Sequence, residues 1–80
     1  MRILTDTYEF QKARIIRIVD ELAPGKVVEF DDASIFIRFR VRDPFLNIDL
    51  TDVSGEWLPC ELDDKSDDWM RTFINGLAHG

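Results

Sequence analysis

Apolar side chains recur every three to four positions near the start of the chain. Over residues 6–22 this spacing is typical of an amphipathic helix. Asp6 and Glu9 form a capping-box pattern at its beginning, with Thr5 as a competing cap, and the segment 23–25 (Ala-Pro-Gly) ends it. The predicted apolar stripe consists of Tyr8, Ile15, Ile16, Val19, Leu22 and Ala23, and the other faces carry Arg14, Arg17, Asp20 and Glu21.

The same helical spacing returns near the end of the chain. Ser66 is a good N-cap residue, and Asp67 and Asp68 suit the positive end of a helix that begins there. Gly76 is expected near the end of this helix. Its predicted apolar stripe consists of Trp69, Met70, Phe73, Ile74 and Leu77.

Between the two helices, apolar and polar residues alternate, which is the pattern of strands with one buried face. The three expected strands span residues 26–30, 34–42 and 45–51. If the apolar side chains share one face, the register of both antiparallel hairpins follows. The expected pairs are Phe30–Ile35 and Val28–Ile37 in the first hairpin, and Val41–Leu46, Phe39–Ile48, Ile37–Leu50, Arg38–Asp49 and Arg40–Asn47 in the second.

Residues 51–64 allow two interpretations. Residues 56–58 form either a short fourth strand ended by Pro59, or an irregular crossing with Trp57 under a helix. Either way, the element order is α-β-β-β-(β)-α within a single domain of residues 1–80. The sequence therefore predicts an α+β fold, a two-layer sandwich in which both helices cover one face of an antiparallel meander. That face carries Val28, Phe30, Ile35, Ile37, Phe39, Val41, Leu46, Ile48 and Leu50.

Composition narrows the function classes. The chain has 80 residues and a net charge of −6, which argues against broad binding to nucleic-acid phosphates or to anionic membranes. It has no apolar run long enough for a transmembrane helix, and its first residues do not resemble a signal peptide. Cys60 is a lone cysteine, so no intramolecular disulfide forms, and we expect a cytoplasmic protein.

Residues suited to catalysis are scarce. The single histidine, His79, is next to the last residue, and Cys60 has no basic neighbour to lower its thiol pKa. One cysteine and one histidine do not make a four-ligand zinc site. The adjacent acid pairs are explained by turn and cap chemistry, and there is no glycine-rich phosphate loop. We therefore expect neither an enzyme nor a bound cofactor or metal.

Two helices cover only one face of the sheet, so the other face meets water or a partner. Aromatic residues and arginines are typical of protein–protein interfaces. The first hypothesis is therefore a protein-interaction module, homodimeric or with another protein partner, that binds through this open face. The alternative is a solvated ladder of salt bridges. The candidate contact residues are Phe36, Arg38, Arg40, Arg42, Phe45, Asn47 and Asp49.

The uneven charge supports a second hypothesis. Residues 1–42 carry eight basic and seven acidic side chains, whereas residues 43–80 carry two and nine. An acidic inhibitor, such as an immunity protein or a phage-type antagonist that mimics nucleic acid, would bind a basic partner through residues 56–68. A third hypothesis is nucleic-acid binding by Arg38, Arg40 and Arg42. The candidate acidic surface consists of Glu56, Glu61, Asp63, Asp64, Asp67 and Asp68.

Overall fold

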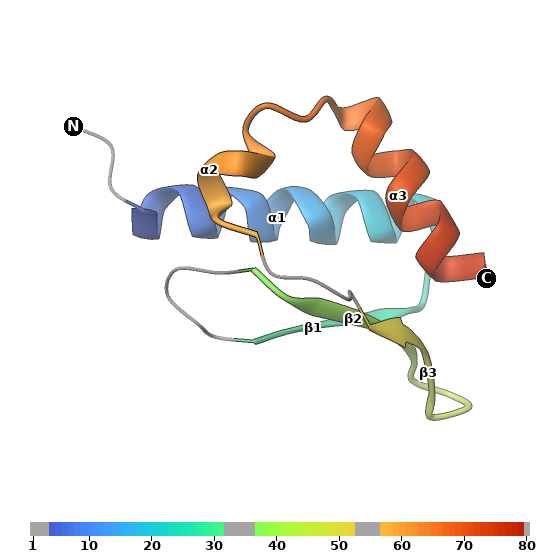
Figure 1. Cartoon of the computed structure of the whole chain (residues 1–80). Coiled ribbons are helices and arrows are strands. Elements are labelled where there is room, and N and C mark those ends of the chain that lie inside the picture. Colours follow the sequence, from blue (N-terminus) through green and yellow to red (C-terminus); the bar gives the residue numbers. More distant parts are fainter. Residues whose placement is uncertain (1–3, 32–36, 53–56, 80) are drawn as a thin grey trace.

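A helical layer lies over one face of an antiparallel sheet (Figure 1). The computed structural model describes residues 4–31, 37–52 and 57–79, and this part of the chain forms three helices and three strands. The strands are in the order β1-β2-β3. The predicted α+β class and two-layer arrangement are confirmed. The elements are α1 (Leu4–Leu22), β1 (Val27–Phe30), β2 (Phe39–Asp43), β3 (Ile48–Asp52), α2 (Pro59–Leu62) and α3 (Asp67–His79).

Helix α1 buries most of the predicted stripe, including Tyr8, Ile15 and Val19, but Ile18 takes the place of Ile16. It begins at Leu4, so Asp6 lies inside the helix and is not its N-cap. Ile18 is fully buried, whereas Ile16 is 48% exposed. The two side chains point in nearly opposite directions, because positions two residues apart are separated by about 200° around the helix axis. The buried face also includes the polar residues Thr7 and Gln11, and Arg14, which the apolar pattern places on another face. Its members are Thr7, Tyr8, Gln11, Arg14, Ile15, Ile18 and Val19.

The first hairpin keeps the predicted faces but not the predicted register. Phe30 pairs with Phe39, and Val28 pairs with Val41 instead of Ile37. The partner of Val28 thus moves by four residues, and an even shift leaves each side chain on its original face. The rings of Phe30 and Phe39 are in contact, with ring centroids 5.8 Å apart. Ile35, the predicted partner of Phe30, lies outside the described residues.

The second hairpin is shifted further, and its predicted pairs are wrong. Strand β3 begins at Ile48, which pairs with Asp43. Arg42 pairs with Asp49 and Val41 with Thr51, so a bulge interrupts the register between Val41 and Arg42. The residues expected to start the strand form its connecting turn instead, and the apolar side chains of that segment do not enter the core.

The crossing from sheet to helices combines the two interpretations of this segment. Ile37 forms an isolated antiparallel bridge with Trp57, and the Ile37 amide donates to the Trp57 carbonyl at 2.9 Å. Trp57 is half-buried and packs against the core. The short helix α2 then follows, with Pro59 in its first turn. Glu61 helps to start it by accepting the Leu58 amide hydrogen at 3.0 Å.

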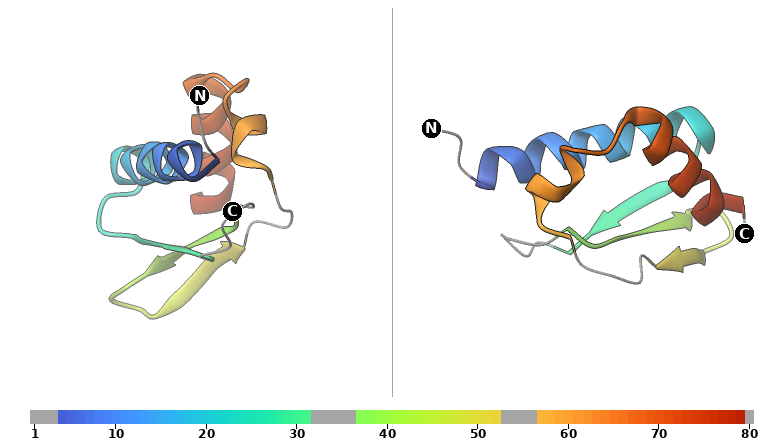
Figure 2. Two further views of the ribbon diagram at one scale, coloured as in Figure 1. Left: turned by 90° about the vertical axis from the view of Figure 1, so that its left-hand side faces the viewer. Right: turned by 45° about the horizontal axis from the view of Figure 1, so that its top comes forward.

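Helix α3 begins as predicted and runs longer than predicted. Ser66 Oγ accepts the Trp69 amide at 3.1 Å, which is N-cap geometry. Met70 and Ile74 are fully buried, and the helix continues through Gly76 to its end at His79. Gly76 therefore does not end the helix. Figure 2 shows α3 descending from the helical layer toward the sheet.

The core lies between these layers. Ten buried residues from α1, β2, α2, α3 and the bridge at Ile37 form one cluster, and half-buried apolar residues surround it. Tyr8 sits at one margin of this core, where its hydroxyl donates to the Asp31 carbonyl. The cluster consists of Tyr8, Ile15, Ile18, Val19, Ile37, Phe39, Val41, Leu62, Met70 and Ile74.

Candidate interaction surfaces

The open sheet face carries arginines that are paired with carboxylates. Arg38 lies 3.3 Å from Asp31, and Arg40 lies 3.5 Å from Asp49. The predicted opposition of Arg38 and Asp49 is wrong, because the shifted register brings Asp49 to Arg42. All these pairs are exposed, and exposed ion pairs contribute little to stability.

Arg42 makes several polar contacts on this face. It forms ion pairs with Glu29 at 2.9 Å and with Asp49 at 2.7 Å. It also donates to Asn47 Oδ1 at 2.9 Å. The hydrogen bond to Glu29, followed by the charges of Glu29 and Asp49, raises the pKa of Arg42. The face thus brings Arg42, Asn47 and Asp49 together at one end of the sheet, as part of the predicted contact set.

The two aromatic members of that predicted set do not lie together on the face. Phe36 is outside the described residues. Phe45 lies in the turn between β2 and β3, where it is 86% exposed, and its neighbour Leu46 is 66% exposed. Ile48, the first residue of β3, is 55% exposed. Leu46 and Ile48 were predicted to be buried, which is wrong. We call Phe45, Leu46 and Ile48 the apolar turn, which projects from the end of the sheet (Figure 1).

Asp43 holds the apolar turn in shape. Its Oδ1 accepts the amides of Phe45 at 2.9 Å and Leu46 at 3.2 Å. Its Oδ2 forms an ion pair with Lys26 at 2.9 Å. The hydrogen bond from Lys26, followed by those from the two amides, lowers the pKa of Asp43. Asn47 completes the turn with a left-handed φ of 55°, and its amide donates to the Asp43 carbonyl at 2.7 Å.

The predicted acidic surface is largely engaged within the molecule. Glu61 caps α2, and Asp63 accepts a hydrogen bond from Gln11 of α1. Asp68 forms an ion pair with Arg71 at 3.3 Å. Asp64 is exposed on the connection between α2 and α3, and Glu56 lies outside the described residues.

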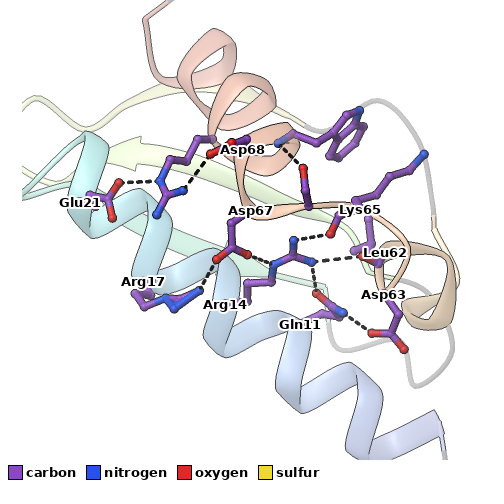
Figure 3. Close-up of polar contacts among 12 residues, drawn as sticks. Gln11, Arg14, Arg17, Glu21, Leu62, Asp63, Lys65, Asp67 and Asp68 are labelled. Atoms are coloured by element: carbon purple, nitrogen blue, oxygen red, sulfur yellow. Dashed lines mark hydrogen bonds and ion pairs between the residues drawn. The ribbon is translucent and has the colours of Figure 1, made fainter.

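Arg14 is the centre of a polar network that joins the three helices (Figure 3). Its Nε lies 2.9 Å from Asp67 Oδ1 at the start of α3. Nη1 donates to Gln11 Oε1 and to the Leu62 carbonyl, both at 3.1 Å, and Nη2 donates to the Lys65 carbonyl at 2.6 Å. Because Arg14 is only 7% exposed, these bonds satisfy its guanidinium inside the fold.

Two further contacts fasten α3 onto α1. Arg17 lies 3.6 Å from Asp67, and Arg71 pairs with Glu21 at 2.8 Å. The hydrogen bond from Arg14 lowers the pKa of Asp67, and that from Arg71 lowers the pKa of Glu21. A groove of about 430 Å³ runs along this network, but its polar floor is hydrogen-bonded within the protein. We therefore assign the network to structure. The groove is lined by Phe10, Gln11, Ala13, Arg14, Arg17, Asp63, Lys65 and Asp67.

Sequence reasoning missed this network because Gln11 and Arg14 are polar residues on a buried helix face. Their spacing carried a signal, since Gln11, Arg14 and Ile18 follow each other at the three- and four-residue intervals of one helix face. A buried arginine at such a position requires carboxylate or carbonyl partners. Asp67 at the start of α3 supplies the carboxylate, and Leu62 and Lys65 before it supply the carbonyls.

A second apolar surface lies on α3. Trp69 and Phe73 stack with ring centroids 5.5 Å apart and an interplanar angle of 5°. Trp57 meets Phe73 edge-on at 5.3 Å, and Lys65 Nζ lies 5.1 Å from the centre of the Trp69 ring. Trp69 and Phe73 line an open recess of about 390 Å³, which we call the aromatic recess. Its lining residues are Asp68, Trp69, Thr72 and Phe73.

Reactive chemistry has few candidates in the described part of the chain. No group of three or more His, Cys, Asp and Glu residues in residues 4–31, 37–52 and 57–79 is placed to hold a metal ion. Cys60 is exposed on α2. None of the described helices combines the length and the apolarity needed to cross a membrane. Comparison with protein-family models, curated proteins and solved structures gave no match for this chain.

Proposed function

We propose that this protein is a non-enzymatic interaction module that binds a protein partner through the apolar turn and the adjoining end of the open sheet face. One observation carries the proposal: the fold holds three large apolar side chains in water on a turn that is itself hydrogen-bonded at several points. Exposed apolar clusters of this kind, rimmed by polar residues, mark interaction sites.

The geometry of the turn favours tight binding. Asp43 fixes the backbone of Phe45 and Leu46, so a partner would not have to order this segment on binding. Phe45 offers an aromatic anchor, the residue class that often dominates interface energies. Arg42 and Asn47 lie beside it, bonded to each other, and supply the polar rim.

The internal contacts of the described acids favour this proposal over an acidic antagonist. Glu61 and Asp63 accept hydrogen bonds from within the chain, and Asp67 forms an ion pair with Arg14, so these carboxylates already have partners inside the molecule. Nucleic-acid binding is disfavoured in the same way, because Arg40 and Arg42 face carboxylates at short range. If binding to the partner weakened steeply with added salt, the acidic antagonist or the nucleic-acid-binding protein would be favoured instead.

Photo-crosslinking in host cells tests the proposal. A photoreactive phenylalanine analogue replaces Phe45 in one variant and Phe10 in another. Phe10 is the matched control, an exposed phenylalanine (58%) on α1, away from the turn. We expect discrete crosslinked products from position 45 that do not form from position 10. Equal, diffuse labelling from both positions would contradict the proposal.

A further inference from the structure

Strand β1 lies at an edge of the sheet. Strand β2 pairs with one side of it, and in the described part of the chain nothing pairs with the other side. The Asp31 amide donates to the Arg38 carbonyl at 2.9 Å, just beyond the end of β1. Because bonded and non-bonded pairs alternate along an antiparallel ladder, Glu29 is hydrogen-bonded to β2, whereas the amides and carbonyls of Val28 and Phe30 point outward.

Helix α1, which runs above the sheet in Figure 1, borders this free edge. Lys12 Nζ lies 5.4 Å from the centre of the Phe30 ring, and Ile16 and Val28 line one notch of about 290 Å³. Lys12, Ile16 and Asp20 follow each other at four-residue intervals, about 6 Å along a helix. Alternate residues of a strand are about 6.6 Å apart, so an added strand would place one side chain near each of these α1 residues. The notch is lined by Ile16, Arg17, Val19, Asp20, Lys26 and Val28.

We propose that the free edge of β1 and the notch beside it bind an extended segment of a partner protein, which joins the sheet as a strand antiparallel to β1. The segment carries an aliphatic side chain opposite Val28 and an acidic side chain opposite Phe30. In an antiparallel strand, the acidic residue then comes two positions before the aliphatic one. This second site shares no residue with the apolar turn and goes beyond the proposed function.

The outward backbone groups of β1 select an extended peptide as the occupant. Val28 and Phe30 each offer one amide and one carbonyl to a new neighbour. Hydrogen bonds to such an edge supply affinity in strand addition, and pockets for alternate side chains supply specificity. A helix satisfies its backbone groups internally, and a lipid surface offers no row of amides and carbonyls, so neither matches this edge.

The notch and the charges of α1 select the side chains of the segment. A residue opposite Val28 projects from the same face of the sheet, toward Ile16. The notch of about 290 Å³ accepts a leucine or isoleucine side chain, since about 150 Å³ holds a benzene ring. A residue opposite Phe30 lies near the Lys12 ammonium, whose N–H donors suit a carboxylate. Asp20 at the other end of the row repels an acid and so sets the order.

A synthetic peptide titrated into isotope-labelled protein tests the site. The probe is Ser-Thr-Glu-Thr-Ile-Thr-Ser with blocked ends, followed by amide NMR spectra. We expect saturable shifts at the amides of Val28 and Phe30, larger than those at Val27 and Glu29, with a dissociation constant below about 1 mM. Hydrogen exchange should be rapid at Val28 and Phe30 in the free protein and slower in the complex.

Modified peptides test the contacts without changing the protein. A methyl group on the isoleucine nitrogen removes a donor that faces β1, whereas a methyl group on the preceding threonine nitrogen alters an amide that faces away. We expect the first to weaken binding at least about tenfold and the second to stay within about threefold. Exchanging glutamate for lysine should weaken binding about two- to fivefold, the effect of an exposed ion pair.

Two protein variants test the other side of the contact, with circular dichroism as a check of the fold. Val28→Pro removes an outward amide and no hydrogen bond to β2, a position where edge strands tolerate proline. Ile16→Gln removes an apolar wall of the notch, and Phe10→Gln is its matched control on α1. We expect Val28→Pro and Ile16→Gln to weaken binding at least about threefold and Phe10→Gln to stay within about twofold.

Four results would overturn the inference. The first is no saturable shift at Val28 and Phe30 with peptide at about 5 mM, well above the expected constant. The second is equal binding of the two methylated peptides. The third is protection of Val28 and Phe30 that grows with protein concentration alone, which would make a second copy the occupant. The fourth is a set of shifts confined to residues 43–48, which would place the peptide on the apolar turn.

Discussion

Replacing Arg14 is expected to be the most destabilising change at a charged residue of α1. Arg14→Met keeps the length of the apolar stem and removes the guanidinium. The buried Gln11 side-chain oxygen and the Leu62 carbonyl then lose a donor, as do the Lys65 carbonyl and the Asp67 carboxylate. A buried acceptor left without a partner costs about 1–3 kcal/mol.

The magnitude follows from these two buried acceptors. We expect Arg14→Met to lower the free energy of unfolding by about 3–5 kcal/mol, the range measured when one partner of a buried ion pair is removed. Small domains have a total stability of about 5–15 kcal/mol, so Arg14→Met would remove a large share of it. Arg14→Lys retains the charge but not the planar fork, and should lose an intermediate amount.

Arg17→Met is the matched control. Arg17 is the same residue type, one turn further along α1, and its contact to Asp67 is an exposed ion pair at 3.6 Å. Its removal should cost less than about 1 kcal/mol. Urea unfolding followed by tryptophan fluorescence gives both values. If Arg14→Met loses no more stability than Arg17→Met, the polar network does not hold the helices together as described.

Three smaller effects are also expected. Glu21, Asp43 and Asp67 have lowered pKa values in the folded state, so the stability that they provide is present above their unfolded pKa of about 4 and is lost as the pH falls through the folded values. Urea midpoints measured from pH 6 to pH 2 should therefore decrease as the pH is lowered below about 4. The decrease should be less steep in Asp43→Asn. Ser66→Ala should cost about 1 kcal/mol in urea unfolding through loss of the α3 cap, and no change would contradict the cap assignment. Gly76→Ala should stabilise the protein by about 0.5–1 kcal/mol, because an added Cβ meets nothing within 4 Å, and a lower thermal midpoint would refute this.

The class of fold was predictable because it depends on coarse periodicity. Helical spacing located α1 and α3, and alternation located three strands in the right order. Ser66 was recognised as the cap of α3 because capping is local chemistry, between a hydroxyl and an amide three residues away. Such features need no knowledge of the distant parts of the chain.

Strand register was not predictable, because it depends on turn lengths that hydrophobic patterning does not determine. Pairing Val28 with Val41 buries the same faces as pairing it with Ile37, so alternation alone does not separate the two. The Arg14 network was missed for a different reason. Its acceptors include backbone carbonyls of Leu62 and Lys65, which every sequence has and which become specific only when the chain is folded.

The error at the second hairpin bears directly on function. Alternation placed Leu46 and Ile48 in the core, where their burial would contribute about 1.5–3 kcal/mol each. The structure exposes both, because Asp43 closes the turn early through hydrogen bonds to the amides of Phe45 and Leu46. Leu46 and Ile48 are thus exposed although the apolar–polar alternation, which the rest of the sheet follows, would bury them, and Asp43 fixes the turn that exposes them. Such departures are expected at functional sites, where contact with a partner restores the burial that folding leaves incomplete.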